Sequence, residues 1–130
     1  DISVDTIPTQ IETSIGKLNI EPELLEADGG LHLGDGRWEQ LVDATALEGA
    51  QLRFRRAGDT IWPLGAPGEK KLKDYYIDKK VDRQVRGFLP VAARGSRVLW
   101  ALGVGVARDC AVTPDTSKTA LLRWQGLKLW

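Results

Sequence analysis

Three closely spaced lysines offer the clearest chemistry in this sequence. Lys70, Lys71 and Lys73 follow a segment broken by Pro67 and Gly68, and they open a stretch of helix-forming residues. Lysine side chains and the free N–H groups at the start of a helix both attract phosphate, so this junction is a candidate phosphate contact. A plainer interpretation stays open, in which the lysines belong to a solvated helix face balanced by the aspartates that follow.

The formal net charge of zero conceals a separation of charge along the chain. Residues 1–51 hold two basic and eleven acidic side chains, a balance of −9, whereas residues 52–97 hold twelve basic and five acidic ones, a balance of +7. Such asymmetry favours a polyanionic partner for the basic segment. The alternative is that the two halves face and neutralise each other.

Catalytic and metal-binding chemistry finds little support. The sequence has neither a Gly-x-Ser-x-Gly elbow nor a P-loop, and its acidic residues show no spacing that singles out a catalytic pair. Cys110 and His32 are the only cysteine and histidine, which excludes an internal disulfide and makes a structural zinc site implausible. We therefore expect no catalytic residue, cofactor or metal in this chain.

Compartment and chain extent follow from similar arguments. No run of about 18 apolar residues is present, so no membrane contact is expected, and no secretory signal opens the chain. The single cysteine favours a reducing, cytoplasmic compartment. The chain begins at Asp1 and lacks methionine, so we expect it to be part of a longer protein. No oligomeric state is predicted.

We expect mainly strands to position the basic residues, because apolar and polar residues alternate in short runs between Gly- and Pro-containing turns. The predicted strands are 17–21, 31–33, 37–42, 52–55, 98–106, 121–124 and 127–130. Hairpins are expected at Gly34-Asp35-Gly36 and at Gln125-Gly126. Residues 1–16 are a tail, a linker or a strand, and residues 17–130 are expected to form one domain.

Strict alternation within 52–55 also predicts which side chains are available. Leu52 and Phe54 are expected to face the core, and Arg53 and Arg55 the solvent.

Two short helices are predicted in the middle of the chain, at 70–81 and 83–89. In the first, Leu72, Tyr75 and Tyr76 fall on one face, and Asp82 can cap the second. The fold class expected is therefore α+β and β-rich, with antiparallel sandwich-like or barrel-like sheets.

A set of short segments resembles the C-terminal domain of bacterial tRNA(Ile)-lysidine synthetase. The segments are Leu52-Arg53-Phe54-Arg55-Arg56-Ala57-Gly58-Asp59, Pro63-Leu64-Gly65, Lys70-Lys71-Leu72-Lys73-Asp74, Asp78-Lys79-Lys80-Val81, Arg86, Leu89-Pro90, Val98-Leu99-Trp100, Gly103, Val112-Thr113 and 121–124. The resemblance covers about residues 50–124. It departs at Asp82, where the family often has proline.

The resemblance implies a function and a partner. The family's enzyme uses ATP and lysine to convert the wobble cytidine of tRNA(Ile) to lysidine, in an N-terminal catalytic domain whose Ser-Gly-Gly-x-Asp-Ser loop is absent here. The C-terminal domain is held to grip the tRNA toward its acceptor stem, with a fold similar to a domain of the phenylalanyl-tRNA synthetase beta chain. The parent would be an ATP-dependent ligase, and this chain a non-catalytic module.

We expect the RNA contacts to come from basic residues within the matching segment. The candidates are Arg53, Arg55, Arg56, Lys70, Lys71, Lys73, Lys79, Lys80, Arg83 and Arg86. The alternative function is a protein-interaction or intramolecular docking module with a basic face and no RNA affinity of its own.

Overall fold

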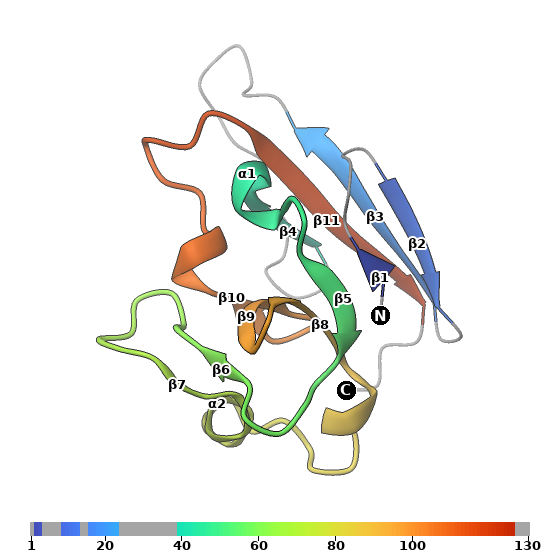
Figure 1. The fold of residues 1–130 in the computed structure, drawn as a ribbon. Coiled ribbons are helices and arrows are strands. Elements are labelled where there is room, and N and C mark those ends of the chain that lie inside the picture. Colours follow the sequence, from blue (N-terminus) through green and yellow to red (C-terminus); the bar gives the residue numbers. More distant parts are fainter. Residues whose placement is uncertain (1, 4–8, 14–15, 24–38, 127–130) are drawn as a thin grey trace.

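The computed structural model describes residues 2–3, 9–13, 16–23 and 39–126 (Figure 1). The strands are β1 (Ile2–Ser3), β2 (Thr9–Thr13), β3 (Gly16–Glu23), β4 (Glu39–Asp43), β5 (Gln51–Phe54), β6 (Thr60–Ile61), β7 (Lys70–Lys71), β8 (Pro90–Arg94), β9 (Arg97–Ala101), β10 (Gly105–Val106) and β11 (Thr119–Gly126). The helices are α1 (Ala44–Leu47) and α2 (Leu72–Asp78), with 3-10 turns η1 (Arg86–Phe88) and η2 (Arg108–Cys110).

The strands form two sheets. Sheet A has seven strands in the order β1-β5-β8-β9-β6-β7, with β10 also paired to β9, and sheet B has the order β2-β3-β11-β4. All described pairings are antiparallel except that of β6 with β9. The β-rich α+β architecture expected from the sequence is thereby confirmed, with one parallel pair added.

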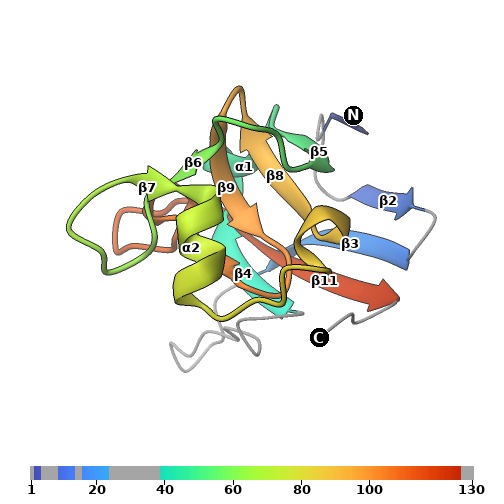
Figure 2. The same ribbon diagram turned by 90° about the horizontal axis from the view of Figure 1, so that it is seen from below.

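Sheet A is buried on both faces. On one side, Leu52 and Ala92 pack with side chains of sheet B, among them Leu122 of β11. On the other side, Val91 and Ala93 pack with residues of α2. Figure 2 shows α2 and sheet B on opposite sides of β8 and β9. The molecule therefore has three layers, and α2 is held against the outer face of sheet A.

A β-bulge explains the apolar run that begins at Val98. Ala92 pairs with Trp100 and Ala93 with Val98, so Leu99 is an extra residue on β9. Leu99 and Trp100 consequently both enter the core between the sheets. The run 98–106 is not one strand, as predicted, but two, because the chain turns back through Leu102–Val104 and β10 pairs with β9.

The chain ends differ from the prediction in how they pair. The sequence predicts a tail, a linker or a strand for residues 1–16. The described parts of this segment form β1, which pairs with β5, and β2, which pairs with β3. The hairpin expected at Gly34-Asp35-Gly36 lies outside the described residues, and the adjoining β4 pairs with β11. The turn expected at Gln125-Gly126 is wrong, because both residues lie within β11, opposite β3.

Both predicted helices are shorter than expected. Lys70 and Lys71 form β7, because their backbone pairs with β6, and α2 begins only at Leu72. The predicted burial of Leu72, Tyr75 and Tyr76 on one helix face is confirmed. In place of a helix at 83–89 the chain forms only the 3-10 turn η1, preceded by an Asp82 side chain that accepts from the Gln84 N–H at 2.8 Å.

Candidate nucleic-acid interface

A cleft of about 560 Å³ lies between the loop after β5 and the junction of β7 with α2. We call it the basic cleft. Its lining residues are Arg55, Arg56, Ala57, Gly58, Asp59, Lys71, Leu72 and Lys73. Four of these eight residues are basic, and the single acidic one, Asp59, is paired with an arginine behind the cleft. The cleft therefore gathers four candidate residues from segments separated in sequence.

The loop wall of the basic cleft is a tight turn. The Asp59 N–H donates to the Arg56 carbonyl at 3.2 Å, and the Asp59 carboxylate accepts from the Arg56 N–H at 2.7 Å. Gly58 occupies φ +89°, a conformation that favours glycine. The turn leaves Arg56 exposed and Arg55 half-buried at the cleft.

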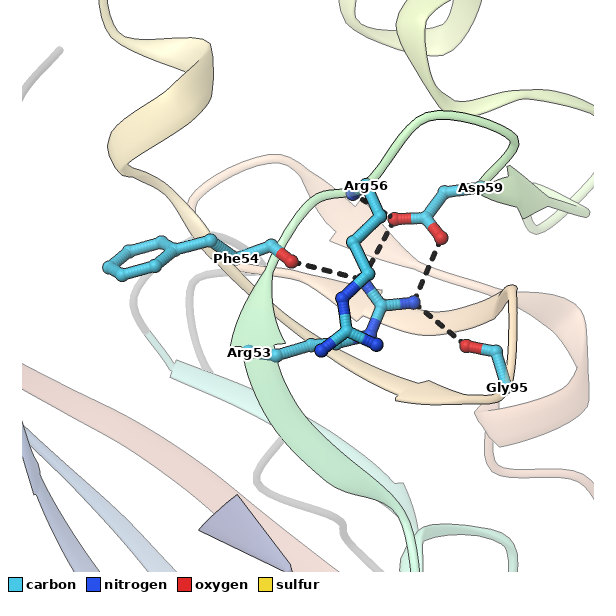
Figure 3. Close-up of polar contacts among 5 residues, drawn as sticks. All are labelled: Arg53, Phe54, Arg56, Asp59 and Gly95. Atoms are coloured by element: carbon cyan, nitrogen blue, oxygen red, sulfur yellow. Dashed lines mark hydrogen bonds and ion pairs between the residues drawn. The ribbon is translucent and has the colours of Figure 1, made fainter. Parts of the chain in front are cut away.

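Behind the turn lies a buried ion pair (Figure 3). The two terminal nitrogens of Arg53 donate to the two carboxylate oxygens of Asp59 at 2.9 and 2.8 Å. The same guanidinium also donates to the carbonyl oxygens of Phe54 and Gly95. Arg53 and Asp59 are only 6% and 4% exposed. The pair therefore ties the loop to the β8–β9 turn.

The buried and exposed side chains at the end of β5 are the reverse of those expected from the sequence. Arg53 was expected to face solvent and Phe54 the core, but Arg53 is buried and Phe54 is 51% exposed. A buried arginine is tolerated here because the pair and two carbonyls accept from four of its N–H bonds. Arg53 therefore supports the surface from beneath and is not one of its exposed cations.

The ion pair also sets the charge state of Asp59. Burial alone raises the pKa of this carboxyl, but the hydrogen bonds from Arg53 and from the Arg56 N–H outweigh burial and leave the pKa below its ordinary value. Asp59 is therefore ionised at neutral pH, where its charge is matched by Arg53. The cleft keeps the positive charge of its other four ionisable residues.

The second wall is fixed to the first through the backbone. The Leu72 N–H, at the start of α2, donates to the Asp59 carbonyl at 2.9 Å, and Thr60 pairs with Lys71 across β6 and β7. Lys71 and Lys73 are exposed. Within the described part of the chain, neither side chain makes a hydrogen bond or an ion pair. They are therefore available to a ligand without breaking an existing contact.

Contacts with α2 hold one candidate of the cleft, Arg55, and two others, Lys79 and Lys70. The Arg55 guanidinium lies 5.9 Å from the centre of the Tyr76 ring, and the Lys79 ammonium lies 5.8 Å from that of Tyr75. Lys70 pairs with Asp78, on the last turn of α2. The alternative in which the following aspartates balance the lysines therefore holds for Lys70, which pairs with Asp78, but not for Lys71 and Lys73.

The remaining candidates follow α2 along the chain. Arg86 is half-buried and donates to the Val81 carbonyl at 3.0 Å. Lys80 and Arg83 are exposed. None of these three lines the cleft, so the structure separates a central group in the cleft from a peripheral group after α2.

Other reactive groups lie apart from this surface. Cys110 is buried in the core between the sheets, and burial raises the pKa of its thiol to about 12, so it is a thiol at neutral pH. Among the described residues, no group of three His, Cys, Asp or Glu side chains could hold a metal ion. No helix in this part of the chain is long and apolar enough to cross a membrane.

Two features of the site were missed from the sequence. The role of Asp59 is one, although its spacing of six from Arg53 allows a pair across the loop. The other is the exposure of two phenylalanines: Phe54, expected to face the core, is 51% exposed, and Phe88 is 58% exposed. The available signal was Arg56, which directly follows Arg55 and ends the alternation, because a strand end beside a turn need not keep one face buried.

Comparisons with known proteins point to one family. The sequence model described as "TilS substrate C-terminal domain" matches residues 50–124, the part that contains the basic cleft. A tRNA(Ile)-lysidine synthase of Clostridium tetani is 30% identical over 123 residues, which are 92% of this chain and 26% of the relative. One of Symbiobacterium thermophilum is 40% identical over 86 residues, 65% of this chain and 17% of the relative.

A solved structure agrees with these matches at the level of fold. It is described as "Crystal structure of TILS C-terminal domain" and superimposes with a TM-score of 0.73 at 23% identity, covering 97% of this chain and 96% of that chain. The curated relatives are much longer, since the chain spans between 17% and 26% of the two named above.

Proposed function

Because this chain belongs to the TilS substrate C-terminal domain family, we propose that it is a tRNA-recognition module of a tRNA(Ile)-lysidine synthetase. In this proposal the domain grips the backbone of tRNA(Ile), toward the acceptor stem. A separate N-terminal catalytic domain attaches lysine to the wobble cytidine with ATP, in the cytoplasm. The domain itself contributes binding and no chemical step.

The basic cleft carries this proposal. It presents Arg55, Arg56, Lys71 and Lys73 around one cavity, and its only acid is neutralised from behind. Phosphate groups of a nucleic acid are attracted to such a concentration of positive charge, and each contact releases counterions. Duplex RNA is recognised mainly through its shape and backbone, which suits a site made of lysine and arginine.

The peripheral cations extend the same surface. Lys79 and Lys80 directly follow α2, and Arg83 and Arg86 come next, before β8. We propose that the RNA backbone passes from the cleft across these residues. Lys70, which pairs with Asp78, contributes less, because a phosphate must displace the carboxylate.

The test is a titration of tRNA(Ile) into the domain at several salt concentrations, comparing the wild type with a Lys71→Ala/Lys73→Ala variant. Each phosphate contact contributes about 0.7 to 0.9 to the slope of log affinity against log salt. We therefore expect weaker binding and a slope reduced by about 1.5. Stability should not change, because Lys71, at the N-cap position of α2, makes no side-chain capping bond.

Lys118→Ala is the matched control, because Lys118 is exposed in the loop before β11 and does not line the cleft. It should leave affinity and slope as in the wild type. If the double variant also leaves both unchanged, or if the wild type binds no tRNA, the basic face serves to dock against the parent enzyme instead.

A further inference from the structure

The exposed fractions of the phenylalanines and tyrosines are the reverse of what the polarity of these side chains predicts. The chain has two phenylalanines and two tyrosines. Both phenylalanines are more than half exposed, Phe54 at 51% and Phe88 at 58%, whereas Tyr75 and Tyr76 are 4% and 0% exposed. An exposed phenylalanine leaves a large apolar ring in water, which costs free energy unless a partner covers it.

The two rings come from neighbouring elements. Phe54 ends β5 and pairs with Pro90 of β8, and Phe88 ends η1, two residues before Pro90. Figures 1 and 2 both place η1 beside the end of β5. In Figure 3 the Phe54 ring points away from the contacts of the Arg53–Asp59 pair. The backbone segments that carry the two exposed phenylalanines therefore lie side by side.

Arginines flank both phenylalanines in the sequence. Arg55 and Arg56, which line the basic cleft, directly follow Phe54, and Arg83 and Arg86 precede Phe88. The backbone beneath the rings is held in place: the Phe54 carbonyl accepts from Arg53 at 3.0 Å, and Leu89, next to Phe88, is 2% exposed. Two exposed phenylalanines on a backbone that is held in place thus lie next in sequence to arginines, two of which line the cleft.

We infer that Phe54 and Phe88 form a stacking platform for unpaired nucleobases of the RNA whose backbone occupies the basic cleft. This inference rests on the proposed function and adds a subsite to it. Aromatic rings beside arginines are suited to single-stranded nucleic acid, because every base has a flat face that stacks on a ring while the cations bind the phosphates. An apolar protein surface would gain nothing from the surrounding arginines unless it were also acidic.

The experiment uses two RNA hairpins with the same duplex stem, one ending in a single-stranded 3′ tail and one blunt. The wild-type domain is expected to bind the tailed hairpin more tightly, by on the order of ten-fold for each stacked base. A Phe54→Ala/Phe88→Ala variant should lose this preference and bind the blunt hairpin as the wild type does. A Phe54→Trp/Phe88→Trp variant should retain the preference, because tryptophan also stacks.

Leu64→Ala serves as the control for loss of an exposed apolar side chain, since Leu64 is 63% exposed in a different loop. It should bind both hairpins as the wild type does. The platform is overturned if the double alanine variant keeps the preference for the tail, or if it weakens only the association with the rest of the parent enzyme. A wild-type domain that binds neither hairpin contradicts the proposed function itself.

Discussion

Among the individual residues, the pair of Arg53 and Asp59 determines which cations a ligand can reach. The N–H groups of Arg53 are bonded to Asp59 and to two carbonyl groups, so the positive charge of the cleft comes from Arg55 and Arg56 on the turn and from the two lysines of the other wall. The same carboxylate fixes that turn through the Arg56 N–H, and the Asp59 carbonyl accepts from Leu72. One buried pair therefore links both walls of the cleft, and the spacing of the cleft cations depends on it.

Replacing Asp59 by Asn should destabilise the domain and alter its response to acid. Removing one partner of a buried pair leaves an unpaired charge and costs about 3 to 5 kcal/mol, measured by urea unfolding at neutral pH. Because the pKa of Asp59 is lowered in the folded state, its contribution is present above its unfolded pKa and is lost as pH falls through the folded value. The wild type should lose this contribution below about pH 3.8, whereas the variant has none to lose.

Asp78→Asn provides the comparison, because Asp78 pairs with Lys70 while the two side chains are 55% and 36% exposed. An exposed pair contributes about 1 kcal/mol at most. Equal losses of stability in the two variants would show that the Arg53–Asp59 pair has no special structural role.

At the level of elements, the end of α2 retains an unfavourable backbone conformation. The Lys80 N–H donates to the Ile77 carbonyl at 3.0 Å and the Val81 N–H to the Tyr76 carbonyl at 2.9 Å, the pattern of a Schellman motif. Lys80 occupies φ +57°, where glycine is preferred, and is the only non-glycine residue with positive φ in the described part of the chain. Such strain in an exposed lysine is consistent with a need for its charge at this position.

Lys80→Gly is therefore expected to raise the free energy of unfolding by about 1 kcal/mol and to weaken tRNA binding. Lys80→Ala should weaken binding to the same extent without the gain in stability, since alanine keeps the strain. Chemical denaturation and tRNA titration of the two variants measure both effects. A glycine variant that binds tRNA as tightly as the wild type would remove Lys80 from the interface.

The helices and strands also show which features of this protein can be predicted from local sequence patterns. Local periodicity predicted the buried face of α2 and the position of β5, because both depend on side chains close in sequence. It did not predict that Lys70 and Lys71 form a strand, since that depends on pairing with β6. Nor did it predict the burial of Arg53, which requires a carboxylate six residues later. The clustering of Arg55 and Arg56 with Lys71 and Lys73 depends on the same long-range pairings.

At the level of the whole molecule, the residues that stabilise the fold and the residues proposed to bind RNA lie in different places. The core between the sheets and the core beneath α2 together bury apolar side chains of β3, β4, β5, β8, β9 and β11. The basic cleft, the cations after α2 and the two exposed phenylalanines lie at the end of β5, in the loop after it, at the junction of β7 with α2, and between α2 and β8. Charge variants in the cleft should therefore change binding without unfolding the domain.

Binding of tRNA at the basic cleft can be tested by mapping backbone amide resonances by NMR during a titration with tRNA(Ile). We expect the largest, salt-sensitive changes in residues 54–59 and 70–73, with smaller ones in 79–88. Amides of β2 and β3, on sheet B, should change little. Changes centred on sheet B, or no changes at low salt, would contradict the claim.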